Sequence, residues 1–253
     1  MELFDCNCWY GVPRRPPLAG AETAEVLVEE MARAGIDTAL VRNAAIFEQS
    51  PVTGNRLTSD DCAKYEALEP SWGILPPQTD ELGDLDEFIA AMRRENVRSL
   101  WAYPEKHRYL LSATTMGGLF EEMVCRGVPL FLRRNEMPGK FDTYELAERV
   151  LLDFPGLRLI IVAHGSWGED RLFRPLMERF PNFAVDTSRY ELDGGIEEIC
   201  NTCGPTRLLF GTNFPETPMG GPLLTLLQAN ISDDDRALIA GGNLRGMLEE
   251  VRL

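Results

Sequence analysis

One stretch constrains the fold of this chain more than any other, the run LRLIIVAHGSWG at residues 157–168. Its first part is mostly branched and apolar and does not alternate, which is typical of a parallel strand buried on both faces. The run then reaches His164, so the sequence predicts a strand whose C-terminal end delivers a polar side chain. In barrels of parallel strands the chemistry lies at these ends. The other histidine, His107, is interpreted as a solvated loop residue.

Seven further strands are predicted, and apolar residues at helical spacing separate most of them. Eight strand and helix units in 253 residues favour a closed parallel barrel, a single (β/α)8 domain over residues 1–253, rather than an open doubly wound sheet. The polar segment after Asn43 is predicted as a functional loop, followed by a helix over residues 61–68. The seven strands are expected at residues 3–9, 36–41, 71–75, 97–103, 128–132, 182–188 and 206–212.

The connections on the two sides of this barrel differ in length. Those from helix to strand are minimal, whereas those after strands one, two, four, five and eight are long and carry Pro, Gly, Arg and Trp. In a barrel this asymmetry predicts one plain face and one face where ligands bind.

Composition excludes several classes of partner. The chain has 25 Lys and Arg against 40 Asp and Glu, a formal net charge of −15, which disfavours binding to nucleic acid or to an anionic membrane. No apolar run of membrane-spanning length and no N-terminal signal is evident, so a cytoplasmic protein is predicted. Its six cysteines are interpreted as reduced thiols. Cys6 and Cys8 are expected to share the face of strand one opposite Asn7.

The C-terminal half carries a resemblance to a known family. The segments LIIVAHGSWG, RLLFGTNFPETP and SDDDRALIAGGNLRGML follow one another in order and spacing. They are similar to strand six, strand eight and the closing helix of the amidohydrolase superfamily, in its amidohydrolase-related branch of decarboxylases and hydrolases. The resemblance covers essentially the whole chain and implies the same barrel.

The family pattern implies a divalent metal held by imidazoles and a carboxylate. It places an H-x-H pair at the end of strand one, histidines after strands five and six, and an aspartate after strand eight. In this sequence those positions carry Asn7, Trp9, Arg133, His164 and Asn213. An amide is a weak neutral ligand and a guanidinium is a permanent cation, so we predict a site without metal or other cofactor.

Arginines at strand ends suggest a different ligand. Arg133 replaces a metal ligand, and Arg42 follows strand two, while the orientation of Arg14, Arg15, Arg134 and Arg189 is left open. Guanidinium groups bind carboxylate or phosphate in a bidentate manner, so a small anionic molecule is the expected partner. The family includes a metal-independent branch, the pyrone dicarboxylate lactonases, in which arginines bind substrate carboxylates.

That branch relies on the strand-eight aspartate, and an amide at Asn213 cannot activate water. Other acid and base candidates are therefore few. His164 is either a general acid or base or a side chain hydrogen-bonded to the backbone or to Asn213. Asp186 on strand seven is the nearest acidic candidate, although alternation leaves open whether Asp186 or Thr187 faces inward. Asp5 and Glu216 are interpreted as structural.

Two functions of different classes follow. The first is a metal-independent hydrolase or lyase on a small carboxylated substrate, with His164 and Asp186 as catalytic residues. Its substrate would be bound by Arg133, Asn7, Asn213, Arg42 and Trp9. The second is a catalytically inactive pseudoenzyme that binds a small anionic metabolite or a protein partner. A metal enzyme with an unexpected ligand set is a third option, and the interpretation leaves room for a homodimer.

Aromatic residues near strand ends are candidates for the walls of such a site. They are Trp9, Trp101 and Trp167.

Overall fold

A computed structural model describes residues 1–17, 19–134, 142–164 and 169–253. The end of the apolar run, residues 165–168 with Trp167, lies outside the described residues. The strands of the described part are β1 (Phe4–Tyr10), β2 (Thr38–Asn43), β3 (Leu68–Pro70), β4 (Trp72–Gly73), β5 (Leu100–Ala102), β6 (Leu130–Arg133), β7 (Leu159–Val162), β8 (Phe183–Asp186) and β9 (Leu208–Leu209).

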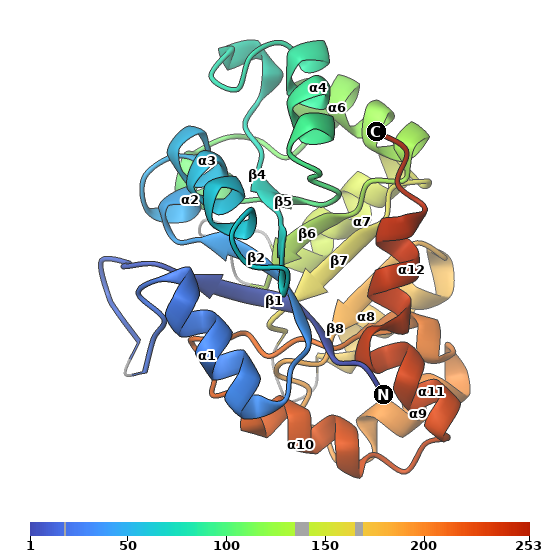
Figure 1. The fold of residues 1–253 in the computed structure, drawn as a ribbon. Coiled ribbons are helices and arrows are strands. Elements are labelled where there is room, and N and C mark those ends of the chain that lie inside the picture. The colour runs from blue at the N-terminus through green and yellow to red at the C-terminus, as the bar shows by residue number, and fades with distance from the viewer. Residues whose placement is uncertain (18, 135–141, 165–168) are drawn as a thin grey trace.

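Helices separate these strands and lie around the outside of them (Figure 1). In chain order they are α1 (Ala24–Ala34), α2 (Ala45–Glu48), α3 (Pro51–Cys62), η1 (Pro77–Thr79), α4 (Leu85–Arg94), α5 (Pro104–His107), α6 (Ala113–Arg126), α7 (Thr143–Asp153), α8 (Asp170–Arg179), α9 (Gly195–Thr202), η2 (Pro205–Arg207), α10 (Gly220–Gln228), α11 (Asp233–Ala237), η3 (Leu238–Gly242) and α12 (Asn243–Glu249).

The strands form one closed parallel ring. β1, β2 and β3 pair in order, and β4 to β9 pair in order, all in parallel. Only Ser71 separates β3 from β4, so these two form a single barrel strand that joins the two sheets. On the other side, Cys6 N–H donates to the carbonyl oxygen of Phe210, just after β9, at 2.9 Å. The predicted eight-stranded barrel is therefore confirmed.

Alternation along the strands sorts the core into two layers. One cluster combines Phe4, Leu40, Phe131 and Leu209 from the strands with Leu244 of α12, so it fills the barrel and is covered by α12 at one end. The larger cluster packs the opposite strand faces against the helices. Side chains two residues beyond an inward position therefore reach the C-terminal mouth of the barrel.

Strand β1 departs from alternation. Its register with β2 shifts between Asp5 and Cys8, and the Asp5 carboxylate accepts from the Asn7 N–H at 2.9 Å and from the Cys8 thiol at 2.9 Å. This is a β-bulge, which re-aims the side chains that follow it. Cys6 belongs to the barrel interior and Cys8 to the outer cluster. The expectation that both cysteines share a face was wrong because of this bulge.

The polar segment after Asn43 is helical, so the predicted loop was wrong and the helix expected over residues 61–68 was displaced. α3 begins at Pro51, and the Ser50 side chain caps it by accepting from Val52 N–H. α2 and α3 then pack closely at Gly54, where an added Cβ would lie 2.2 Å from the Ile46 nitrogen. Local capping and this close contact form two helices from a weakly apolar sequence.

We predict that Gly54→Ala destabilises the protein, because no space exists for the methyl group against the Ile46 backbone. Overpacking of this kind costs about 1–3 kcal/mol of unfolding free energy, measurable by urea denaturation. Gly246→Ala in α12 is the matched control, since an added Cβ there meets nothing within 4 Å. The control should be neutral or stabilising by up to about 1 kcal/mol. Equal effects of the two substitutions would contradict this account.

Candidate functional site

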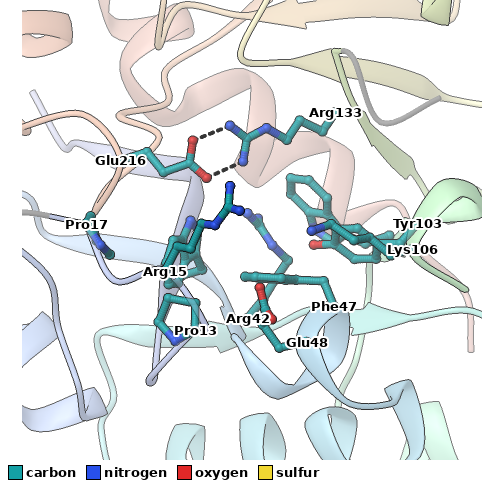
Figure 2. A pocket seen from close by; sticks show the side chains of 12 residues that line it. Pro13, Arg15, Pro17, Arg42, Phe47, Glu48, Tyr103, Lys106, Arg133 and Glu216 are labelled. Atoms are coloured by element: carbon teal, nitrogen blue, oxygen red, sulfur yellow. Dashed lines mark hydrogen bonds and ion pairs between the residues drawn. The ribbon is translucent and has the colours of Figure 1, made fainter. Parts of the chain in front are cut away.

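A pocket of about 330 Å³ lies at the mouth of the barrel. Its residues come from the segments after β1, β2, β5, β6 and β9, which are the five connections that the sequence marks as long. Figure 2 shows their side chains converging on one space. The lining consists of Trp9, Pro13, Arg15, Pro17, Arg42, Phe47, Glu48, Trp101, Tyr103, Lys106, Arg133 and Glu216.

Arg42 is the most deeply buried charge of this pocket, with 2% of its surface exposed. It follows the inward Leu40 by two residues, so β2 aims it at the mouth. Its guanidinium carbon lies 3.4 Å from the centroid of the Trp101 ring, and its Nη2 donates to Asn7 Oδ1 at 3.0 Å. Its Nε and Nη1 are buried and have no hydrogen-bond partner among the described residues. Two of its donors are therefore buried beside the pocket without an acceptor from the described residues.

Asn7 lies beneath Arg42 and connects it to Asp186. The Asn7 Nδ2 donates to Asp186 Oδ2 at 3.1 Å and to Asn213 Oδ1 at 3.5 Å. Asp186 also accepts from the backbone N–H of Ala163 at 2.9 Å. Since Ala184 lies in the barrel interior, alternation directs Asp186 inward, which resolves the choice between Asp186 and Thr187. These polar groups form a buried network below the pocket.

Burial raises the pKa of Asp186, although the charge of His164 and the hydrogen bonds from Asn7 and Ala163 oppose that rise. Asp5 is likewise fully buried, and burial raises its pKa despite hydrogen bonds that favour its ionised form. Both carboxyl groups are enclosed by protein and do not line the pocket.

His164 lies outside the pocket. The preceding Ala163 has a φ of 53°, in the left-handed region, which ends the alternation of β7 and turns the next side chain away from the mouth. The ring is fully buried between Phe173 and Tyr190, at centroid distances of 5.2 and 5.1 Å. Its Nε2 lies 2.8 Å from the carbonyl oxygen of Asp186. The imidazole thus contacts the outer core and the backbone of β8.

Arg133 and Glu216 form an ion pair in the lining of the pocket. Both oxygens of Glu216 accept from Arg133, and Figure 2 shows the side chain of Arg15 directed toward the same carboxylate. Burial alone would raise the pKa of Glu216, but the hydrogen bonds and charge of Arg133, together with the charge of Arg42, lower it. Glu216 is therefore ionised and surrounded by cations.

Aromatic rings form the remaining wall. Phe47 meets Trp9 edge to face at 5.3 Å and lies 5.6 Å from Tyr103, between ring centroids. The indole Nε1 groups of Trp9 and Trp101 are buried and, like two nitrogens of Arg42, lack a partner within the described part of the chain. The wall is therefore apolar, and its two indole N–H groups are buried.

The structure brings together some of the predicted site residues and separates others. Trp9, Arg42 and Arg133 line the pocket. Asn7 lies below it with Asn213 and Asp186, and His164 lies behind it. Among the arginines left open, Arg15 lines the pocket, Arg134 pairs with Asp142 and Glu169, and Arg14 and Arg189 are exposed.

Sequence reasoning missed several lining residues. Phe47 and Glu48 lie in α2, inside the segment that the sequence analysis predicted as a functional loop. The apolar pair Ile46-Phe47, in a polar stretch after a strand end, was the available signal. Lys106 was missed because α5 is a single turn. Its neighbour His107 is partly buried, not solvated, with Nε2 at 2.9 Å from the Ile46 carbonyl oxygen, and burial lowers its pKa.

Among the described residues, no group of three or more His, Cys, Asp or Glu side chains could hold a metal ion. No helix among them combines the length and apolarity needed to cross a membrane.

The closed ring of parallel strands surrounded by helices places this chain in the class of (β/α)8 barrels. A family model described as "Amidohydrolase" matches residues 9–247, nearly the whole chain, and the protein belongs to that family. No curated protein matches it by sequence.

Solved structures of the same fold cover the whole chain. An uncharacterised TIM-barrel protein from Bordetella bronchiseptica is 20% identical, with a TM-score of 0.76 over 99% of each chain. A 2,6-dihydroxybenzoate decarboxylase from Rhizobium is 15% identical, with a TM-score of 0.79 over 98% of each chain. A dihydroxybenzoic acid decarboxylase from Polaromonas, with bound manganese and an inhibitor, is 15% identical, with a TM-score of 0.76 over 100% of this chain and 98% of that one. At these identities the likeness shows the fold.

We predict that Glu216→Gln lowers the unfolding free energy by about 1 kcal/mol at neutral pH, the upper range for a partly exposed ion pair. The pKa of Glu216 is lower in the folded than in the unfolded state, so the folded state binds fewer protons. The contribution is therefore present above the unfolded carboxyl pKa of about 4.3 and is lost as the pH falls through the folded value. Urea denaturation of both proteins across this range should show the difference shrinking in acid. A difference that stays constant would contradict the assignment.

Proposed function

We propose that this protein is a metal-independent hydrolase or lyase that acts on a small carboxylated molecule bound at the mouth of the barrel. The observation that carries the proposal is Arg42, a buried guanidinium at the pocket with two donor nitrogens that have no partner among the described residues. A buried polar group without a partner is costly, and a carboxylate supplies two acceptors to a guanidinium.

The rest of the lining supports an anionic, flat ligand. Arg15, Arg42, Lys106 and Arg133 provide four positive charges, whereas Glu48 and Glu216 provide two negative charges. Aromatic side chains supply apolar walls of the kind that hold planar molecules. In a chain of net charge −15 such a local excess of cations favours a specific anion site.

The donor set supports a reaction without the metal that the family pattern implies. At the positions expected for ligands, the oxygen of Asn7 accepts from Arg42, and Arg133 is paired with Glu216. Trp9 offers an N–H and no lone pair, and His164 directs its Nε2 at a backbone carbonyl. A cation among these groups would also meet the charge of Arg42. These residues do not fit a divalent ion.

A second function, a carboxylate-binding protein without catalysis, is favoured by a specific observation. His164 and Asp186, the catalytic residues expected from the sequence, are both fully buried and both hydrogen-bonded within the fold. A general acid or base must reach the proton that it transfers. Under this alternative, His164 and Asp186 position Asn7 and Arg42, and the pocket binds a ligand without converting it.

We predict that Arg42→Met weakens binding of benzoate by about ten- to hundredfold, the loss of one charge-assisted pair, measured by isothermal titration calorimetry. Methionine replaces the unbranched part of the buried side chain and removes the guanidinium. The unfolding free energy should fall by no more than about 1 kcal/mol, because two unpaired donors leave with the charge. Arg189→Gln removes the same charge from an exposed strand-end position and should leave the affinity unchanged.

Equal effects of these two substitutions on benzoate binding would overturn the carboxylate site.

The two functions are separated by turnover. Incubation with a panel of carboxylated aromatic compounds and lactones, followed by mass spectrometry for loss of carbon dioxide or gain of water, distinguishes an enzyme from a binding protein. Turnover that Arg42→Met abolishes supports the first function, and binding without turnover across the panel supports the second.

We predict that His164→Ala lowers the unfolding free energy by about 2–4 kcal/mol, because it opens a cavity beside Phe173 and Tyr190 and leaves the Asp186 carbonyl oxygen unpaired. Benzoate affinity, measured below the unfolding transition, should stay within about twofold. A variant of unchanged stability with abolished turnover would instead establish His164 as a catalytic acid or base.

A further inference from the structure

Glu216 occupies the position in the pocket where an anion is expected. Arg133 binds both oxygens of its carboxylate, and the positive charge of Arg42 lowers its pKa. Figure 2 shows the side chain of Arg15 directed toward the same carboxylate. Arg133 thus binds a carboxylate that belongs to the protein itself, and two further guanidinium groups, Arg15 and Arg42, line the same pocket.

We propose that Glu216 is an internal competitor for the ligand, a specificity-determining residue that withholds Arg133 from any molecule lacking a second anionic group. The inference rests on the proposed carboxylate site at Arg42. A ligand with one carboxylate pairs with Arg42 and leaves the Arg133–Glu216 pair in place. A ligand with two anionic groups can replace Glu216 on Arg133 with its second group.

The exchange requires a side-chain rotation and no movement of the loop. The Glu216 N–H donates to the Asn213 carbonyl oxygen at 3.0 Å, as does the Thr217 N–H at 3.2 Å, so a tight turn holds this backbone. The Asn213 side chain is itself joined to Asn7 and lies at 3.4 Å from the Thr217 hydroxyl. About a third of the Glu216 side chain is exposed, 35%, so the carboxylate can turn into solvent.

The energetics of the Arg133–Glu216 ion pair also favour replacement of Glu216 by a ligand group. Ion pairs that solvent reaches contribute little net stability, because each partner regains hydration when they separate. Arg133 is the last residue of β6, where it pairs with Val162 of β7, so its backbone position is set by the sheet and not by Glu216. A second anionic group would therefore meet an arginine already in place.

Calorimetric titration with benzoate and with isophthalate, which differ by one carboxylate, tests the proposal. Glu216→Gln should bind isophthalate about two- to fivefold more tightly than the wild type, the range expected for release of an exposed ion pair, and should change benzoate binding little. Glu216→Asp keeps the charge but is one methylene too short for the same bidentate contact, and should give an intermediate gain.

Glu48→Gln is the matched control, since Glu48 lines the same pocket from α2 and loses the same charge. An isophthalate gain of equal size in the Glu48 variant would show a general charge effect and overturn the proposal, as would no gain in Glu216→Gln. If Arg42→Met weakens ligand binding but Glu216→Gln leaves it unchanged, the proposed function stands and this inference fails. If no variant binds either probe, both fail.

Discussion

A buried guanidinium at the end of β2 is the constraint on which the mouth of this barrel depends. Moving a charge out of water is costly unless paired groups compensate, and Arg42 receives only part of that compensation, from the Trp101 ring and from the oxygen of Asn7. Asn7 can offer that oxygen because its nitrogen is held by Asp186. The network therefore fixes the direction of Arg42, and two of its buried donors have no partner among the described residues.

The same network explains why the polar residues at the strand ends lie in two levels. The lower level consists of groups that bond to one another and to the backbone, and it includes Asp5, which stabilises the bulge of β1 and accepts from Thr212. The upper level consists of charges and rings that line the pocket. The lower level gives the rigidity that a binding site needs, because buried and fully bonded polar groups restrict movement.

The barrel, its eight strands and the face that carries the pocket could be predicted because they follow from hydrophobic patterning and from loop length. Arg42 and Arg133 could be placed at that face because each stands at the end of a predicted strand, and both line the pocket. The choice between the two interpretations of His164 could not be made from the sequence, because Ala163 takes a left-handed conformation that no local residue type announces. The bulge of β1 was missed for a similar reason, because it depends on Asp5 and on hydrogen bonds to residues distant in sequence.

On the proposed function, the charge distribution of the protein selects both the size of the ligand and the sign of the ligand's charge. The chain as a whole is acidic, and at physiological ionic strength charges further apart than about 8 Å are largely screened from one another. A small anion inside the pocket therefore interacts mainly with the arginines around it, whereas a long polyanion would also lie against the acidic exterior. On the proposed function, the cations of the pocket would bind a small carboxylate without making the protein a general binder of anions.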